Sequence, residues 1–386
     1  SDDDFNSYPL ATQKAYYWQR GEYNFINDWS KSYLAIFNAN YCIEQIDKIK
    51  TGSIQEEEYN NVKGSAHFFR SFYFLHLLWD YAKAFDSSSF NKDLGIVLRL
   101  GTDFNVPSAR ASVKDCYDKV VEDAKLSISY LPDYPRVLLR PSKGAAYGLL
   151  AKTYLSMRIY DSALKYSKLY LSLNDNLIDY NGDSDINGDI VNDVPFKRFN
   201  RETIFYTTMN SDLFNNPWIG LIDTVLYNLF DNNDLRKTAF FKPNGSYFQF
   251  KCIYTGDSYS YFTGIATDEI FLIKAECEAR AGHTVTAMND LNSLLEKRWK
   301  TGTFIPFTAN NPFEALRIVL EERRKELLDR GIRWMDIKRL NKEGADIILT
   351  RKVDQKLYTL APNSNAYALP LPNDVIKASG IPQNKP

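Results

Sequence analysis

The sequence EERRKELLDRGIRWMDIKR, residues 321–339, decides the fold class, because it predicts a charged helix crossed by an apolar stripe. Apolar residues recur at intervals of three and four before, within and after this stretch, which is the spacing of a helix face buried in a core. The stripe consists of Phe313, Leu316, Leu320, Leu327, Trp334 and Ile337. It passes over Arg323 or Arg324 and over Gly331, so an arginine stands where an apolar residue is expected.

A buried arginine in this stretch must be ion-paired, because an isolated guanidinium in an apolar environment costs several kcal/mol. The adjacent acids Glu322, Glu326 and Asp329 are the partners that the sequence offers. We therefore expect a predominantly helical protein in which ion pairs hold this helix against its neighbours.

The same stretch resembles the C-terminal signature of the SusD/RagB family, the nutrient-binding outer-membrane lipoproteins of Bacteroidetes. Four other segments resemble that family in the right order, and the chain closes with a similar proline-rich tail. They are YLAIFNANYCIEQI at 33–46, HFFRSFYFLHLLWDYAKAFD at 67–86, PSKGAAYGLLAKTYLSMRIYDSALKYS at 141–167, IFLIKAECEARAGHTVTAMNDLNSLLEKR at 270–298 and YALPLPNDVIKASGIPQNKP at 367–386. Several matches in one order are far more specific than a single motif, so the resemblance covers nearly the whole chain.

Two departures from the family pattern concern one loop and the start of the chain. After Tyr81 the family turns through a glycine and a proline, whereas this sequence reads Ala82-Lys83-Ala84-Phe85. The chain opens at Ser1-Asp2-Asp3-Asp4, without a charged-then-apolar leader or a lipidated cysteine. We expect that the full-length precursor carries the lipid anchor. This expectation of surface attachment is drawn from the resemblance alone.

The resemblance implies a mainly α protein, a SusD-like α/α superhelix of tetratricopeptide-like helix pairs with an irregular, loop-rich lobe that contains a short hairpin. It also implies a lipid-anchored protein of the outer-membrane cell surface. Such a protein captures an oligosaccharide, polysaccharide or other nutrient and delivers it to a SusC-like TonB-dependent outer-membrane transporter, by binding and without chemistry.

The composition agrees with a globular binding protein. The chain has 386 residues, which corresponds to roughly two to three average domains. The net charge of -1 argues against a nucleic-acid partner, which would require a basic face. No apolar run approaches the ~20 residues that span a bilayer. Aromatic residues make up 15% of the chain, and those beyond the needs of the core can line a sugar-binding face.

The resemblance implies one SusD-like unit over residues 1–386. Within it, the helical periodicity and its interruptions define four segments. Helical repeats are expected at 29–173 and 265–340, an irregular ligand-binding lobe at 174–264, and a C-terminal tail packed on the scaffold at 341–386. The clearest helix pair begins near Tyr147, where bulky, small and aromatic residues follow the order of a tetratricopeptide repeat. In the lobe, Asn244-Gly245 between alternating residues predicts a tight hairpin turn.

One loop of the lobe resembles a calcium-binding loop. Asp183, Asp185 and Asn187 stand at alternate positions, and Asp189 is placed to contribute its backbone carbonyl. Val194 occupies the position where a bidentate glutamate is expected. The alternative is a loop held by Asx turns. The sequence thus predicts no cofactor. Calcium is the ion for which this loop is a candidate site.

The evidence for catalysis is weak. A glycosidase needs two carboxylates, and the cluster Glu321, Glu322 and Glu326 is better explained by pairing with the adjacent arginines. We therefore predict that the protein is not an enzyme. Two alternatives remain open, a secreted all-α glycoside hydrolase and a repeat adaptor that binds only protein.

Ligand binding is assigned to aromatic side chains near turns and amides, because a sugar stacks its C–H face on a ring and needs hydrogen bonds for its hydroxyls. Trp218 is the best candidate, with Asn215 or Asn216 as the polar contact. The further candidates are Trp18, Tyr247, Tyr259 and Tyr261.

Overall fold

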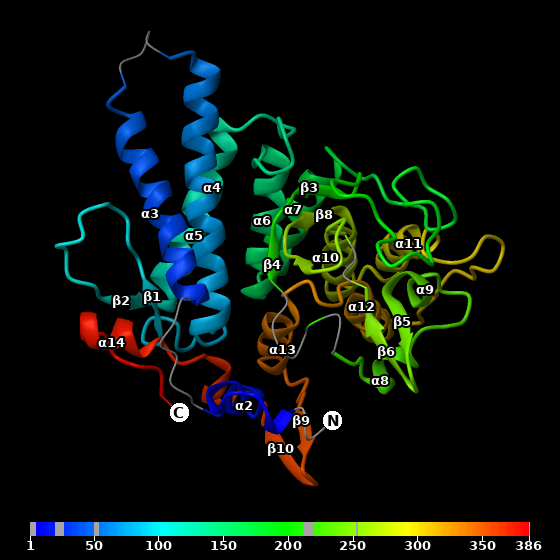
Figure 1. Ribbon diagram of the computed structural model, residues 1–386. Helices are drawn as coiled ribbons and strands as arrows, with labels where there is room; N and C mark the ends of the chain where they lie inside the picture. The colour runs from blue at the N-terminus through cyan, green and yellow to red at the C-terminus, as the bar shows by residue number, and fades with distance from the viewer. Residues whose placement is uncertain are drawn as a thin grey trace. The chain divides into compact units, whose positions relative to one another are not determined.

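The structure is a computed structural model that describes residues 5–385 except 20–26, 50–53, 211–215, 217–219 and 252–253. The chain forms two compact units (Figure 1). Unit 1 comprises Ser1–Tyr130, Ser156–Arg158 and Trp334–Pro386, and unit 2 comprises Leu131–Leu155 and Ile159–Arg333. The predicted helical segment 29–173 therefore contains residues of both units, and residue 173 lies inside unit 2.

Unit 1 is built on three long helices. They are α3 (Asp28–Ile46), α4 (Glu56–Tyr81) and α5 (Val113–Tyr130). Helix α4 packs against both α3 and α5. The remaining elements are α2 (Leu10–Tyr16), α13 (Arg333–Asn341), α14 (Asn373–Ser379), the 3-10 helix Asn365–Tyr367, and the antiparallel pairs β1 (Leu94–Val97) with β2 (Arg110–Ser112) and β9 (Leu349–Val353) with β10 (Lys356–Leu360).

A buried polar contact ties the three long helices together. Arg70 of α4 donates to both carboxylate oxygens of Asp123 on α5, at 2.8 and 2.7 Å, and to the Oδ1 atom of Asn40 on α3, at 2.9 Å. Burial raises the pKa of Asp123, but hydrogen bonds from His67 and Arg70 outweigh it and hold that pKa below its usual range. The arginine of the second helix is thus the junction of the bundle.

The C-terminal end of α4 is capped by segments that are distant in sequence. Lys338 of α13 donates to the carbonyl oxygens of Trp79 and Ala82, each at 2.6 Å. The amide of Leu369 donates to the carbonyl of Asp80 at 2.9 Å. Carbonyls at a helix C-terminus carry a partial negative charge and have no partner within the helix, so a cation is favourable there. The tail, predicted to pack on the scaffold, is held at this helix end.

Unit 2 contains the tetratricopeptide-like helix pairs and the lobe. The longer helices are α6 (Lys143–Ser156), α7 (Tyr160–Leu171), α10 (Thr267–Arg280), α11 (Thr284–Leu295) and α12 (Pro312–Glu326). The lobe adds α8 (Thr224–Tyr227), α9 (Arg236–Phe240) and the two-stranded pairs β3 (Thr203–Phe205) with β8 (Ile265–Ala266), β4 (Thr208–Asn210) with β7 (Ser260–Phe262), and β5 (Phe241–Asn244) with β6 (Tyr247–Phe250). Tyr154 of α6 stacks on Tyr166 of α7 at 5.7 Å between ring centroids, and α10 packs against α7 and α11. The mainly helical fold class, with a hairpin in an irregular lobe, is confirmed.

The predicted hairpin forms with its turn displaced by one residue. Asn244 pairs with Tyr247, so the turn residues are Gly245 and Ser246 rather than Asn244 and Gly245. Gly245 has a φ of 59°, a value that glycine adopts without steric cost. Phe241 and Phe250 of the two strands then pack into the core of the lobe, which also includes Phe240, Tyr254 and Phe262, whereas Tyr247 is exposed.

The stripe that led to the fold prediction is confirmed at Leu327 and Ile337, which are buried, but it is wrong at its start and in its continuity. Phe313 is 88% exposed, whereas Ala315, Val319, Glu322 and Glu326 form the buried face of α12. The helix ends at Glu326, and α13 begins only at Arg333. The buried face is charged because partners from other elements meet it.

Those partners form a buried ion network within unit 2. Arg236 of α9 binds Asp234, Glu322 and Glu326 at 2.7, 2.6 and 2.9 Å. Arg298 binds Glu326 and Glu202, each at 2.7 Å. Arg323 is buried and ion-paired as predicted, but its partner Glu269, at 3.5 Å, lies on α10 and not on its own helix.

Candidate functional site

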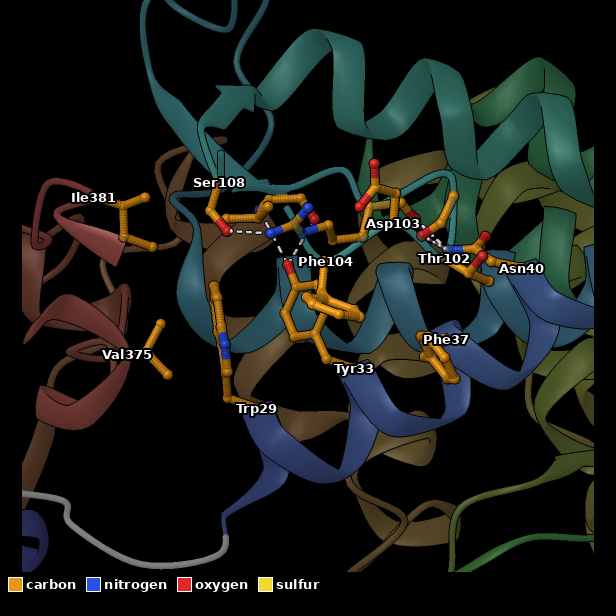
Figure 2. Close-up of a pocket in the computed structure, with 13 residues that line it drawn as sticks. Trp29, Tyr33, Phe37, Asn40, Thr102, Asp103, Phe104, Ser108, Val375 and Ile381 are labelled. Carbon is orange, nitrogen blue, oxygen red and sulfur yellow. Dashed lines mark hydrogen bonds between the residues drawn. The ribbon is translucent and has the colours of Figure 1, made fainter. Parts of the chain in front are cut away.

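A pocket of about 240 Å³ opens in unit 1 between α3, the loop that joins β1 to β2, and the C-terminal tail (Figure 2). Trp29, Val375 and Ile381 form an apolar end, and Asn40, Thr102 and Asp103 lie at the other end. Tyr33 and Phe104 lie between them. The other residues of the lining are Phe37, Val97, Arg99, Gly101 and Ser108. The pocket therefore combines aromatic rings with a polar rim.

Helix α3 supplies the aromatic wall through its periodicity. Trp29, Tyr33 and Phe37 are spaced four residues apart, so they lie on one face of the helix, with an axial rise of about 6 Å between neighbours. The rings of Trp29 and Tyr33 are 4.8 Å apart, and Trp29 meets Tyr81 of α4 edge to face at 5.1 Å. Asn27 caps the helix by accepting a hydrogen bond from the amide of Ser30. The contact with Tyr81 and the cap at Asn27 thus hold the aromatic side chains of α3 in place.

Tyr33 joins this wall to strand β1. Its hydroxyl donates to the carbonyl of Val97 at 2.7 Å and accepts from the amide of Val97 at 3.0 Å. Burial raises the pKa of Tyr33, so the hydroxyl stays protonated at every physiological pH. Both hydrogen-bonding roles of the hydroxyl are used within the protein. Tyr33 consequently offers the pocket its ring.

The loop at residues 98–109 is shaped by polar side chains of α3. Asn40 donates to the carbonyl oxygens of Arg99 at 2.9 Å and Gly101 at 3.4 Å. Glu44 accepts from the amide of Thr102 at 2.9 Å and from its hydroxyl at 2.6 Å, and these bonds lower the pKa of Glu44. Because Arg70 orients Asn40, the ion pair of the bundle core also determines the path of this loop.

The mouth of the pocket carries an exposed ring and charged groups. Phe104 is 86% exposed, although it is a large apolar side chain. Arg99 donates to the carbonyl of Val106 at 2.7 Å and to the hydroxyl of Ser108 at 2.8 Å, which fixes the loop on the other side of the ring. Asp103 accepts from Asn105 through Oδ1. An exposed ring beside a carboxylate and a guanidinium suits a ligand with an apolar face and hydroxyl groups.

The ligand-binding residues predicted from the sequence do not line this pocket, as far as the structure describes them. Trp218 and Asn215 fall outside the described residues, and Asn216 is half-buried. Tyr247 and Tyr259 are exposed in unit 2. Tyr261 is 2% exposed and stacks on Phe250, so its ring belongs to the core of the lobe and offers no surface to a ligand.

Trp18 lies in unit 1 but does not line the pocket. Its ring is half-buried, and the guanidinium of Arg351 lies 4.5 Å from its centroid. It packs with Ile337, Leu360 and Tyr367. This ring therefore contributes to the packing of the N-terminal helix against the C-terminal segment.

The predicted calcium loop is organised around an arginine. Arg201 pairs with Asp183 at 2.6 Å and with Asp185 at 3.0 Å. The side chain of Asn187 donates to the carbonyls of Val194 and Phe196, and Asp189 accepts from the amide of Val191. Within the described residues, no group of three or more His, Cys, Asp or Glu side chains is arranged to hold a metal ion.

The sequence reasoning missed Phe104, Phe37 and Arg99. The four-residue spacing of aromatic residues on α3 was a readable signal of a shared face. Phe104 stands in a loop without periodicity, where only its apolar character among turn residues was unusual. No local pattern shows that Ile381 closes the same pocket.

Comparisons with known proteins agree with this architecture. Residues 3–155, which include every pocket residue except Val375 and Ile381, match the SusD-like family model described as "Starch-binding associating with outer membrane". No curated protein matches this sequence. None of the helices in the described part of the chain combines the length and hydropathy needed to cross a membrane.

Solved structures share the fold over almost the whole chain. A SusD superfamily protein from Bacteroides vulgatus is 18% identical, with a TM-score of 0.78, over 98% of this chain and 89% of that chain. A SusD superfamily protein from Bacteroides thetaiotaomicron is 21% identical, with a TM-score of 0.74, over 93% and 85%. A SusD-like carbohydrate-binding protein from Bacteroides vulgatus is 19% identical, with a TM-score of 0.69, over 92% and 82%. Residues 3–155 are therefore similar to the SusD-like family described as starch-binding and associated with the outer membrane, and the whole chain has the fold of the SusD superfamily structures.

Proposed function

We propose that the protein captures an oligosaccharide in the pocket of unit 1 and delivers it to a SusC-like TonB-dependent outer-membrane transporter. The observation that carries the binding site is the exposed ring of Phe104 above an aromatic wall. Transfer of a sugar face from water onto such a ring is favourable, while the polar rim supplies partners for hydroxyl groups. The family description supports the outer-membrane setting, and a lipid anchor and the transporter partner belong to this proposal.

The size of the pocket favours a chain over a single sugar. Its volume of about 240 Å³ is below the ~300–1,000 Å³ typical of pockets that enclose a whole drug-sized ligand. Tyr41 continues the four-residue series of Tyr33 and Phe37 along α3 and is exposed. A ligand with one ring in the pocket then meets a second ring about 6 Å further along the helix. We expect affinity to rise with chain length.

The arrangement is suited to binding and not to hydrolysis. Of the three carboxylates that a hydrolase could use, Glu322 and Glu326 are buried in ion pairs with Arg236, and the exposed Glu321 pairs with Arg317 of the same helix. Next to the pocket, Glu44 has a lowered pKa, whereas a general acid in glycoside hydrolysis needs a raised one. The family description names a binding function, in agreement with the prediction that the protein is not an enzyme.

The test is a glycan array followed by calorimetric titration of the glycan that binds. Phe104→Ala should weaken that binding, while Phe313→Ala, on an equally exposed ring of unit 2, should leave it unchanged. Trp218→Ala tests the sequence-based alternative in the same titration. Loss of affinity only in Trp218→Ala would place the site in the lobe, and release of reducing sugar would establish the hydrolase alternative.

A further inference from the structure

The two walls of the pocket come from segments that are far apart in the chain. The loop 98–109 follows β1, whereas Val375 and Ile381 belong to the tail that follows β10. Hydrophobic contact alone does not fix the distance between two such segments, because it is non-directional. A directional contact must hold the loop and the tail at the spacing that the pocket has.

Arg110 supplies that contact. It is the first residue of β2, immediately after the loop. Its Nε donates to the carbonyl of Gly95 at 2.8 Å, and one Nη donates to the carbonyl of Leu94 at 3.2 Å, both in β1. Its other Nη donates to the carbonyl of Pro382 at 3.0 Å, next to the pocket residue Ile381. One guanidinium thus binds the base of the loop and the tail.

The same guanidinium reaches the end of α4. The Nη that binds Leu94 also lies 3.5 Å from the carbonyl oxygen of Tyr81, and this oxygen accepts from the side-chain amide of Asn384 at 2.8 Å. Asn384 donates in addition to the carbonyl of Leu369 at 2.7 Å. The ring of Tyr81 packs against Trp29. The hydrogen bonds to the Tyr81 carbonyl therefore also hold this part of the aromatic wall in place.

These contacts require the shape of arginine. The hydrogen-bond partners of Arg110 in the described residues are carbonyl oxygens and no carboxylate, and burial lowers its pKa. A planar guanidinium directs several N–H groups in fixed directions, whereas a lysine ammonium is a compact point charge on a flexible stem. Lysine would keep the charge and lose the simultaneous bonds to β1 and to the tail.

We propose that Arg110 is the positioning residue of the pocket, which sets the spacing between the loop 98–109 and the C-terminal tail without touching the ligand. Asn384 assists it at the shared carbonyl of Tyr81. The proposal rests on the proposed function only where it predicts ligand affinity, because the spacing itself is measurable without a ligand.

Hydrogen–deuterium exchange of the unliganded protein is the first test. Arg110→Ala should raise the exchange of peptides covering residues 94–109 and 369–384 on the order of tenfold, and leave that of α10 unchanged. Arg110→Lys should restore little of this protection. The matched control is Lys114→Ala, which removes a cation from an exposed pair with Asp118 four residues further along the chain. Unchanged exchange in Arg110→Ala would overturn the proposal.

Calorimetric titration with maltoheptaose, a starch fragment, is the second test. Arg110→Ala should weaken binding about tenfold while Lys114→Ala binds as the wild type does. Faster exchange with unchanged affinity would keep Arg110 as the residue that sets the spacing and would place the sugar site elsewhere. If the wild type does not bind maltoheptaose, the exchange measurement alone decides the positioning claim.

Asn384→Ala keeps the claim testable if Arg110→Ala fails to fold. It removes the second donor to Tyr81 and should raise exchange in residues 369–384 alone. Two results together would contradict the proposal. The first is equal exchange in the wild type and Asn384→Ala, and the second is a folded Arg110→Lys variant whose exchange in residues 94–109 and 369–384 equals that of the wild type. They would show that neither donor positions the tail.

Discussion

The two units use buried positive charge in different ways. In unit 2, Arg236 and Arg298 bind buried carboxylates. Unit 1 also has a cation paired with a carboxylate, Arg70 with Asp123, but its buried Lys338 and half-buried Arg110 bind backbone carbonyl oxygens at the end of α4 and in β1. A buried cation that binds carboxylates from several helices and loops forms its ion pairs only when all of these segments are packed together. A cation that binds carbonyl oxygens fixes the path of the backbone. The first arrangement stabilises a scaffold, and the second shapes a pocket.

The largest effect is expected from breaking the network of unit 2. Arg236→Met removes the cation that Asp234, Glu322 and Glu326 share and leaves Arg298 and Lys325 beside these three carboxylates, so it should lower the free energy of unfolding by about 3–5 kcal/mol. Denaturant unfolding measures this change. Arg324→Met, a half-exposed arginine of α12, is the control that should change stability little. A loss below 1 kcal/mol in Arg236→Met would contradict the scaffold role.

The junction of the unit 1 helices should respond to acid. The pKa of Asp123 is lower in the folded state than in the unfolded state, so its contribution to stability is complete above the unfolded value of about 3.9. The contribution is lost as the pH falls through the lower folded value. Asp123→Asn should therefore be less stable than the wild type at pH 7, and the difference should shrink towards pH 2. A difference that is independent of pH would show that the carboxylate charge has no role.

A moderate effect is expected at the pocket mouth. Phe104→Ala removes one stacking surface and should weaken binding of the glycan identified on the array by about tenfold, roughly 1.4 kcal/mol. Because Phe104 is exposed, the melting temperature should stay unchanged. A lowered melting temperature would show that the ring supports the fold.

The smallest effect is expected from calcium. Arg201 already pairs with Asp183 and Asp185, so millimolar calcium should leave the melting temperature of the wild type unchanged. Arg201→Ala frees both carboxylates and provides the comparison. A rise in melting temperature of the wild type with calcium would establish the site that the sequence pattern indicates.

The fold was predictable from the sequence, because helix periodicity and turn residues are local signals. The helix pairs, the hairpin at Gly245 and the burial of Arg323 follow from such signals. The phase of the stripe on α12 was not predictable, because Arg236 and Arg298 decide it and they stand about 90 and 30 residues away from Glu326. The pocket was missed for the same reason, since no local signal relates Phe104 to Ile381.

The contact between Asn384 and Tyr81 also has a kinetic consequence. It joins residues that are 303 positions apart in a chain of 386 residues. Contacts of such long range close a large loop and form late in folding, whereas helices such as α3 and α4 form from local contacts. A folding intermediate can therefore hold the complete helical bundle of unit 1 while the pocket still lacks its last wall. The ability to bind a ligand should appear after the helical signal in a refolding experiment.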